Sequence, residues 1–269
     1  MPIEVDAELL EMSEARFKEI AYAVTGAAFA VHNEYGTLFG EKVYQAALVA
    51  ECVARGLRPV QHEVRIRVTH AGFQKDYYID LLVGGGALFE LKAGVALADE
   101  HRAQALNYLF LAGLPRAKLF NFGADALQHE FVSTRLTAAL RQRLAVVRQR
   151  WEPLDRDSLR FGELLLELLG DWGAFLQLSL YHEAVAHFFG GLESVLYDIP
   201  VIHDGAPLAM QRAWLLNAQT AFKLTAVAGS LDKTELHLRR WLHHTKLKAV
   251  QWVNLHQHDV TFITLLKTP

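Results

Sequence analysis

The chain has 269 residues, of which 52% are hydrophobic and 21% charged, and its formal net charge is −3. This composition is that of a globular protein with one large or two modest domains, and it excludes disordered and collagen-like chains. The single cysteine, Cys52, excludes a disulfide framework, and the slightly acidic charge excludes a basic DNA-coating protein without excluding a local basic groove.

The ends and apolar runs of the sequence indicate the compartment. The N-terminal residues are acidic before any apolar run, which is the wrong charge for a signal or transit peptide. The longest apolar run, 161–180, is interrupted by charged side chains, so no membrane-spanning segment is expected. We therefore expect a cytoplasmic protein with no membrane partner.

The first half begins with two predicted helices, one that Ser13 caps and Gly36 ends, and one over residues 40–55. Alternating apolar residues and glycine turns then predict three strands, a helix and two more strands. The predicted strands cover 64–69, 77–83, 87–93, 117–122 and 127–133, and the helix covers 99–111. The order ααβββαββ indicates a mixed α/β unit.

The second half repeats this order of predicted elements. An offset of 133 positions pairs His70 with His203 and continues without a gap to Asn121 and Asn254. Upstream the offset is 137, where Tyr44 meets Tyr181. We interpret the halves as two copies of one unit, because self-similarity at a fixed period is typical of repeats. The alternative is two α/β domains that share their order by chance.

These patterns predict three segments along the chain. The first copy covers residues 1–134 and the second, degenerate copy covers residues 154–269. Between them lies an arginine-rich stretch, 135–153, which we expect to be a helical linker with a solvated charged face.

Asp80, Glu90 and Lys92 form the most informative cluster. A hairpin centred on Gly85 would place Asp80 opposite Glu90, where facing Cβ atoms lie about 4.5–5.5 Å apart. Because side chains alternate along a strand, Glu90 and Lys92 share one face. Two carboxylates and an ammonium should therefore converge on one patch.

The apolar flanks of these residues predict strands covered on both faces, where facing carboxylates are unfavourable. A divalent cation such as Mg²⁺ or Mn²⁺ would resolve that repulsion, because hard cations prefer carboxylate oxygens, carbonyls and water. Lys92 would then hold the attacking water or stabilise phosphoryl charge. The alternative is a structural ion pair between Lys92 and one carboxylate.

Five blocks of sequence resemble the GxxExxR proteins, a family of the PD-(D/E)XK nuclease-like superfamily. The resemblance covers roughly residues 20–135. The blocks are 36–44, 78–83, 89–93, 104–109 and 119–123. The resemblance implies the restriction-endonuclease-like fold, a mixed sheet flanked by helices. One departure is Gly36-Thr37-Leu38, where family members usually have a Gly-Pro-Gly-like turn.

The resemblance also implies roles for single residues. Asp80 and Glu90 would be metal ligands, and Lys92 the catalytic lysine. Glu41 would assist the metal or its water from the first core helix. Gln104 and Tyr108 match the Q-x-x-x-Y motif; as an i,i+4 pair they share one helix face and can both point into one cleft.

At these positions the second half carries other residues. Ala213 and Lys223 stand where Asp80 and Glu90 stand in the first half, and Thr225, His237, Trp241 and Leu178 replace the other four site residues. The stretch from Lys223 to Lys248 is locally basic with Trp241 and Trp252 nearby, a combination that suits phosphate and base contact. A solvated helix face with core tryptophans is an equally good interpretation.

The sequence thus predicts a Mg²⁺-dependent nuclease acting on nucleic acid, with DNA as the favoured substrate. The alternative is a module that keeps the nuclease fold and binds nucleic acid or a protein without cutting. The second half could supply a binding surface, an internal pseudo-dimer interface or a homodimer interface.

Overall fold

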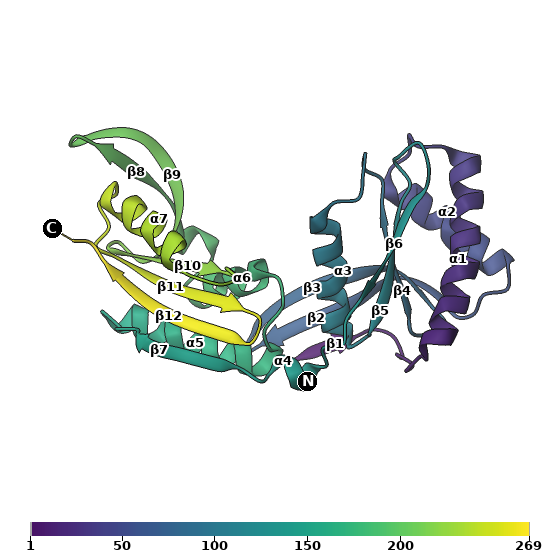
Figure 1. Ribbon diagram of the computed structural model, residues 1–269, viewed down its shortest axis with the longest axis horizontal. Coiled ribbons are helices and arrows are strands. Elements are labelled where there is room, and N and C mark those ends of the chain that lie inside the picture. Colours follow the sequence, from purple (N-terminus) through teal and green to yellow (C-terminus); the bar gives the residue numbers. More distant parts are fainter. Residues whose placement is uncertain (1, 269) are drawn as a thin grey trace. The chain divides into compact units, whose positions relative to one another are not determined.

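The computed structural model describes residues 2–268 and divides into two compact units, Met1–Thr137 and Ala138–Pro269 (Figure 1). Each unit holds one six-stranded sheet with helices against it. The predicted fold class, mixed α/β sheets flanked by helices in two units, is confirmed. Among the described residues, no helix combines the length and the apolar character that crossing a membrane requires.

The first unit has the sheet order β1-β2-β3-β4-β5-β6, in which only β4 and β5 run parallel. Helices α1 and α2 precede β2, and α3 connects β4 to β5. The bounds are β1 Ile3–Val5, α1 Glu14–Tyr35, α2 Glu41–Ala54, β2 Val60–His70, β3 Phe73–Val83, β4 Ala87–Lys92, α3 Asp99–Ala112, β5 Arg116–Asn121 and β6 Gln128–Ser133.

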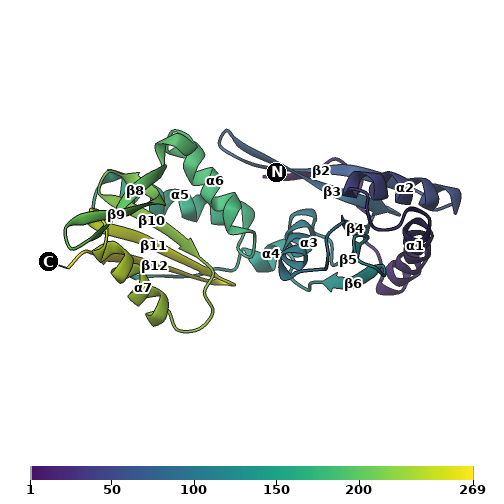
Figure 2. The ribbon, with the colours of Figure 1, turned by 90° about the horizontal axis from the view of Figure 1, so that it is seen from above.

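The predicted helix ends are confirmed, and helices cover both faces of the first sheet. The Ser13 hydroxyl accepts the backbone N–H of Arg16, and Gly36 ends α1 with φ of 67°. Figure 2 shows α1 and α2 on one face of the sheet and α3 on the other. The α1 and α2 side chains pack on β4 in an apolar core that includes Leu48 and Phe89, both fully buried.

A tight hairpin joins β3 to β4 and requires glycine. Gly84 and Gly85 have φ of 64° and 72°, a region that L side chains rarely adopt. A Cβ on Gly86 would lie 2.5 Å from the carbonyl oxygen of Leu10. The register around this turn, with Val83 opposite Ala87, is the one predicted from a hairpin centred on Gly85.

The second unit has the sheet order β7-β12-β11-β10-β9-β8. Its bounds are α4 Ala138–Arg141, β7 Ala145–Arg150, α5 Arg156–Trp172, α6 Leu178–Phe188, the 3-10 helix η1 Leu192–Ser194, β8 Leu196–His203, β9 Ala206–Asn217, β10 Thr220–Thr225, α7 Asp232–His243, β11 Ala249–His256 and β12 Asp259–Leu266. The β8–β9 hairpin curls away from the rest of this sheet (Figure 1).

The predicted helical linker over 135–153 is wrong. Only Ala138–Arg141 is helical, and Ala145–Arg150 forms strand β7, which pairs in parallel with β12. The partner strand lies more than a hundred residues later in the chain, so the local pattern did not show the pairing. Strand β1 also lies outside the predicted elements and pairs with β2.

Strands β8–β12 repeat the pairing directions of β2–β6, and the register follows the offset of 133. Leu88 faces Ala117 in the first unit, and Ala221 faces Val250 in the second. One side-chain hydrogen bond recurs as well: Asn121 Oδ1 accepts the Gly94 N–H at 2.9 Å, and Asn254 Oδ1 accepts the Val227 N–H at 2.8 Å.

A second recurring contact follows the upstream offset of 137. The Tyr44 hydroxyl donates to the carbonyl oxygen of Gly36 at 2.8 Å, and the Tyr181 hydroxyl donates to that of Gly173. In each unit the glycine ends the first long helix, and the tyrosine lies on the second. The same tyrosine-to-glycine hydrogen bond therefore joins the first two long helices of each unit.

Candidate active site

Asp80 lies where β3 loses its regular pairing with both neighbouring strands. Pairing with β4 runs from Val83 to Leu81 and stops there, and pairing with β2 skips Asp80 between Ile79 and Leu81. Its β2 neighbour Glu63 has φ of 51°, a conformation that non-glycine residues seldom adopt. Such local irregularities cluster at functional sites.

The Asp80 side chain reaches the neighbouring strand β4. Its Oδ2 accepts the backbone N–H of Leu91 at 2.8 Å, and the residue is 8% exposed. This bond fixes the carboxylate beside Glu90 and Lys92. The sequence prediction that Asp80 and Glu90 share one patch is consistent with this arrangement.

Glu90 is the most deeply buried charged residue of the cluster, with 1% exposure. Its Oε1 accepts from Lys92 Nζ at 2.8 Å. Its Oε2 is buried and has no hydrogen-bond partner among the described residues. An unsatisfied buried carboxylate oxygen is unfavourable, so this atom is a free ligand position.

Lys92 occupies the centre of the cluster. Its ammonium also donates to the carbonyl oxygen of Leu91 at 2.8 Å and lies 3.8 Å from Glu41 Oε2. The side chain is 13% exposed, whereas that of Glu41 is 40% exposed. Glu41, the first residue of α2, therefore lies at the open side of the cluster.

The ionisation of the cluster follows from burial. Burial raises the pKa of Asp80 to about 6, against the Leu91 N–H and the Lys92 charge, which lower it. Burial and the charge of Asp80 raise the pKa of Glu90 to about 8, although Lys92 is its ion-pair partner. Burial lowers the pKa of Lys92, but the Glu90 contact and the charges of Glu41 and Asp80 together outweigh it, so the net shift is upward. Two carboxylates with raised pKa values beside one cation indicate a site that lacks positive charge.

Gln45 braces this cluster from α2. Its Nε2 donates to the backbone carbonyl of Asp80 at 2.9 Å and to Glu63 Oε1 at 2.7 Å. It thereby satisfies a carbonyl at the point where β2 and β3 do not pair. Lys42 holds the same Glu63 oxygen, and this contact lowers the pKa of Glu63.

Sequence reasoning did not identify Gln45 as a site residue. The available signal was its position four residues after Glu41, which places both on one side of α2. A polar residue on a helix face that also carries the buried Leu48 is a candidate for a buried hydrogen bond.

Gln104 and Tyr108 lie on α3, the helix on the opposite face of the sheet from α2. Gln104 Nε2 donates to the Tyr108 hydroxyl at 2.9 Å, as expected for an i,i+4 pair. Burial and the charge of Glu90 raise the pKa of Tyr108 to about 12. The structure therefore shows the two predicted residues bonded to each other on one face of α3.

The side chains can be tested against the requirements of a divalent cation. No group of three or more His, Cys, Asp or Glu side chains that could hold a metal ion occurs in the described part of the chain. Mg²⁺ is commonly bound through one or two carboxylates with several waters retained. Asp80, the partnerless Glu90 Oε2 and the raised pKa values of both carboxylates therefore fit such an ion.

Among its described residues, 138–268, the second unit has no equivalent of this cluster. Under the offset of 133, Ala213 and Lys223 replace the two buried carboxylates, and Thr225 replaces Lys92. The Thr225 hydroxyl donates to Asn254 Oδ1 at 2.7 Å instead of facing a carboxylate. These positions therefore cannot bind a cation in the same way.

Comparison with known proteins gives a family match for part of the first unit. Residues 18–134 match the family model of the PD-(D/E)XK nuclease superfamily, the same superfamily that the five sequence blocks resemble. No curated protein matches the chain. Among solved structures, the chain is similar to "Crystal structure of SSO0001" at 17% identity and a TM-score of 0.30, over 46% of this chain. The chain spans about 65% of the length of that structure.

Proposed function

We propose that the first unit is a metal-dependent nuclease that hydrolyses phosphodiester bonds in nucleic acid, with DNA as the substrate. The observation that carries this proposal is the pair of buried carboxylates, Asp80 and Glu90, beside Lys92. They lie where β3 and β4 separate, and Glu90 Oε2 lacks a partner. The superfamily match over the same residues supports it.

In this proposal Asp80 and Glu90 hold Mg²⁺ or Mn²⁺. When bound, the ion would polarise the phosphoryl oxygen and lower the pKa of the attacking water. Lys92 donates hydrogen bonds to that water or to the phosphoryl oxygens, because its ammonium is already fixed by Glu90 and the Leu91 carbonyl. Glu41, at the open side, orients the water through its carboxylate.

Gln104 and Tyr108 have a positioning role in this proposal. The Gln104–Tyr108 bond holds the tyrosine hydroxyl in place, and the raised pKa of Tyr108, about 12, keeps this hydroxyl protonated at neutral pH. The hydroxyl can therefore donate to a group bound in the cluster.

The test is cleavage of single- and double-stranded DNA and RNA with Mg²⁺ or Mn²⁺ and with chelator. We expect metal-dependent cleavage that Asp80→Asn and Lys92→Met each slow by about a hundredfold or more. Asp99→Asn is the control, because Asp99 lies at the fully exposed start of α3. Cleavage that both site variants retain at the wild-type rate would refute the assignment.

A second candidate is a module that binds nucleic acid without cutting it. The absence of a third metal-ligating side chain among the described residues favours it. Calorimetric titration with Mn²⁺ separates the two candidates. Binding that Asp80→Asn and Glu90→Gln remove supports the nuclease, and no binding supports the module.

We also propose that the second unit is a degenerate copy of the first. The shared pairing order and the two recurring hydrogen bonds support it. Chance similarity of two α/β folds explains the order of elements but not the recurrence of two side-chain hydrogen bonds at corresponding positions, one at the offset of 133 and one at 137.

A further inference from the structure

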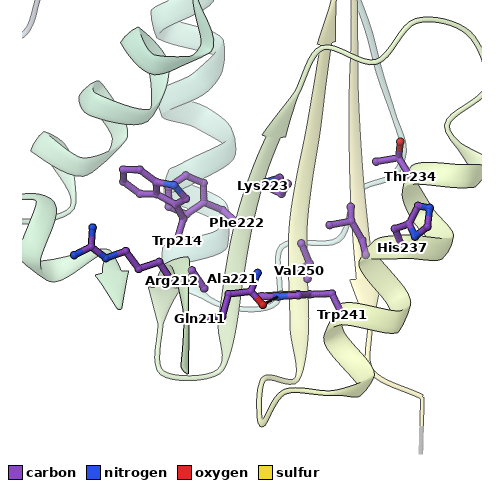
Figure 3. A pocket seen from close by; sticks show the side chains of 12 residues that line it. Gln211, Arg212, Trp214, Ala221, Phe222, Lys223, Thr234, His237, Trp241 and Val250 are labelled. Atoms are coloured by element: carbon purple, nitrogen blue, oxygen red, sulfur yellow. Dashed lines mark hydrogen bonds between the residues drawn. The ribbon is translucent and has the colours of Figure 1, made fainter. Parts of the chain in front are cut away.

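The second unit contains a cavity of about 360 Å³ between β9, β10 and α7 (Figure 3). This volume lies within the range of about 300–1,000 Å³ that is usual for small-molecule sites. The cavity is open because β9 and β10 pair only up to Leu215 and Ala221 and then separate. The part of β9 that does not pair with β10 forms one wall of the cavity, and α7 forms another.

Under the proposed duplication, the cavity lies at the position that corresponds to the Asp80–Glu90 cluster of the first unit. Under the offset of 133, the four residues that replace Asp80, Glu90, Gln104 and Tyr108 all line it. They are Ala213, Lys223, His237 and Trp241. The strands also separate one pair earlier than in the first unit, since Leu81 still faces Phe89 there. Shorter pairing and the small Ala213 side chain leave room where two carboxylates stand in the first unit.

The ionisable side chains of the cavity are basic, whereas those at the corresponding positions of the first unit are acidic. None of the cavity-lining residues is acidic, whereas Arg212, Lys223 and His237 line it. The side chains of Lys223 and His237 have no hydrogen-bond or ion-pair partner among residues 2–268, and both are exposed. Arg212 is only loosely paired with Asp198, at 3.8 Å. The unpartnered ammonium of Lys223, in an aromatic cavity without acidic residues, favours an anionic ligand.

Flat aromatic surfaces provide the other half of the recognition. Trp241 donates from Nε1 to Gln211 Oε1 at 3.3 Å, which holds the indole at the cavity (Figure 3). Trp214 on the opposite wall packs against Phe222 with ring centroids 5.7 Å apart. Held indole rings are stacking surfaces for a planar group.

We propose that this cavity binds single-stranded nucleic acid, with one unpaired base against the tryptophans and its phosphate on Lys223. A paired base is stacked inside its duplex and cannot enter, whereas an unpaired base offers both its face and its edge. The exposed Arg240 and Lys246 continue the positive charge beyond the cavity, which suits a strand better than a free nucleotide.

The test uses the full chain in chelator, so that binding is separated from any cleavage by the first unit. Fluorescence anisotropy with a labelled oligothymidylate measures the affinity. We expect Lys223→Glu to weaken binding by about tenfold or more, since it removes one phosphate contact and adds a repulsion. Lys233→Glu, on the same helix as His237 but outside the cavity, is the matched control and should bind as wild type.

Trp241→Leu tests stacking independently of charge and should also weaken binding by about tenfold. Circular dichroism spectra of both cavity variants check their folding. The proposal is overturned if both cavity variants bind like the control, if a duplex or polyglutamate binds as tightly as the single strand, or if only thymidine monophosphate binds. Cleavage by the first unit is scored separately, so failure of one proposal leaves the other testable.

Discussion

The ammonium of Lys92 lies 2.8 Å from Oε1 of Glu90, two residues earlier on the same strand. If this contact were only a structural ion pair, one cation would suffice for one carboxylate. The cluster instead contains the second buried carboxylate of Asp80 and a Glu90 oxygen without a partner in the described chain. One ammonium therefore cannot compensate both carboxylates when both are ionised, which supports a cation-binding site.

Lys92→Met should lower the cleavage rate by about a hundredfold or more, because one preorganised donor at a developing charge is removed. Lys92→Arg should retain part of the activity, since the positive charge remains. Single-turnover cleavage rates measure the effect, with circular dichroism to confirm that each variant is folded. An unchanged rate in folded Lys92→Met would show that the lysine has a structural role alone.

Gln45→Leu should destabilise the first unit by about 1–3 kcal/mol, because it leaves the Asp80 carbonyl without its buried donor. It should also weaken Mn²⁺ binding through displacement of Asp80. Urea denaturation and calorimetry measure the two effects. Ala46→Leu, on the exposed side of the same helix, is the control, and equal effects of the two substitutions would contradict the bracing role.

Lys118 offers a test of pH dependence away from the site. Burial lowers the pKa of Lys118, and its ammonium donates to the Thr25 hydroxyl at 2.6 Å without an acidic partner among the described residues. Below the pKa that Lys118 has in the folded protein, its ammonium is buried in the charged form. The full destabilisation from burying this charge is therefore present at neutral pH. It declines as the pH rises towards 10.5, the ordinary lysine value.

Lys118→Met should therefore raise the free energy of unfolding at neutral pH, and the gain should shrink as the pH approaches 10.5. Urea denaturation at both pH values measures this difference. Lys18→Met on the exposed face of α1 is the control. The interpretation would be contradicted if the gain in the free energy of unfolding grew with pH. It would also be contradicted if the substitution lowered the free energy of unfolding at neutral pH.

Cys52 should resist alkylation in the folded protein. The residue is fully buried, and burial raises the pKa of its thiol to about 12, so little thiolate forms at neutral or mildly alkaline pH. Labelling with iodoacetamide, followed by mass spectrometry, should be slow in buffer and rapid in urea. Rapid labelling without denaturant would show that α2 opens locally.

Most of the fold could be predicted from the sequence pattern, because apolar periodicity and turn glycines are local signals. The helix cap at Ser13 and the hairpin centred on Gly85 are examples. Strand β7 was predicted as helix because its six residues are all exposed and its partner, β12, is distant in sequence. Strand β1 has three residues, too few for an alternation to be visible.

The site was predictable to a similar extent. Hairpin symmetry and alternation brought Asp80, Glu90 and Lys92 together, since both rules act over a few residues. The two hydrogen bonds of Gln45 were not predictable, because they depend on the interrupted strand pairing at Glu63 and Asp80. The cavity at Lys223 depends on how far β9 and β10 separate, which the sequence does not show.

The central claim is that Asp80 and Glu90 together hold a divalent cation. Crystals soaked with Mn²⁺ and measured for anomalous scattering test it most directly. We predict a peak between these two carboxylates in the wild type and no peak there in Glu90→Gln. Absence of a peak between them in the wild type, with Lys92 still paired to Glu90, would contradict the claim.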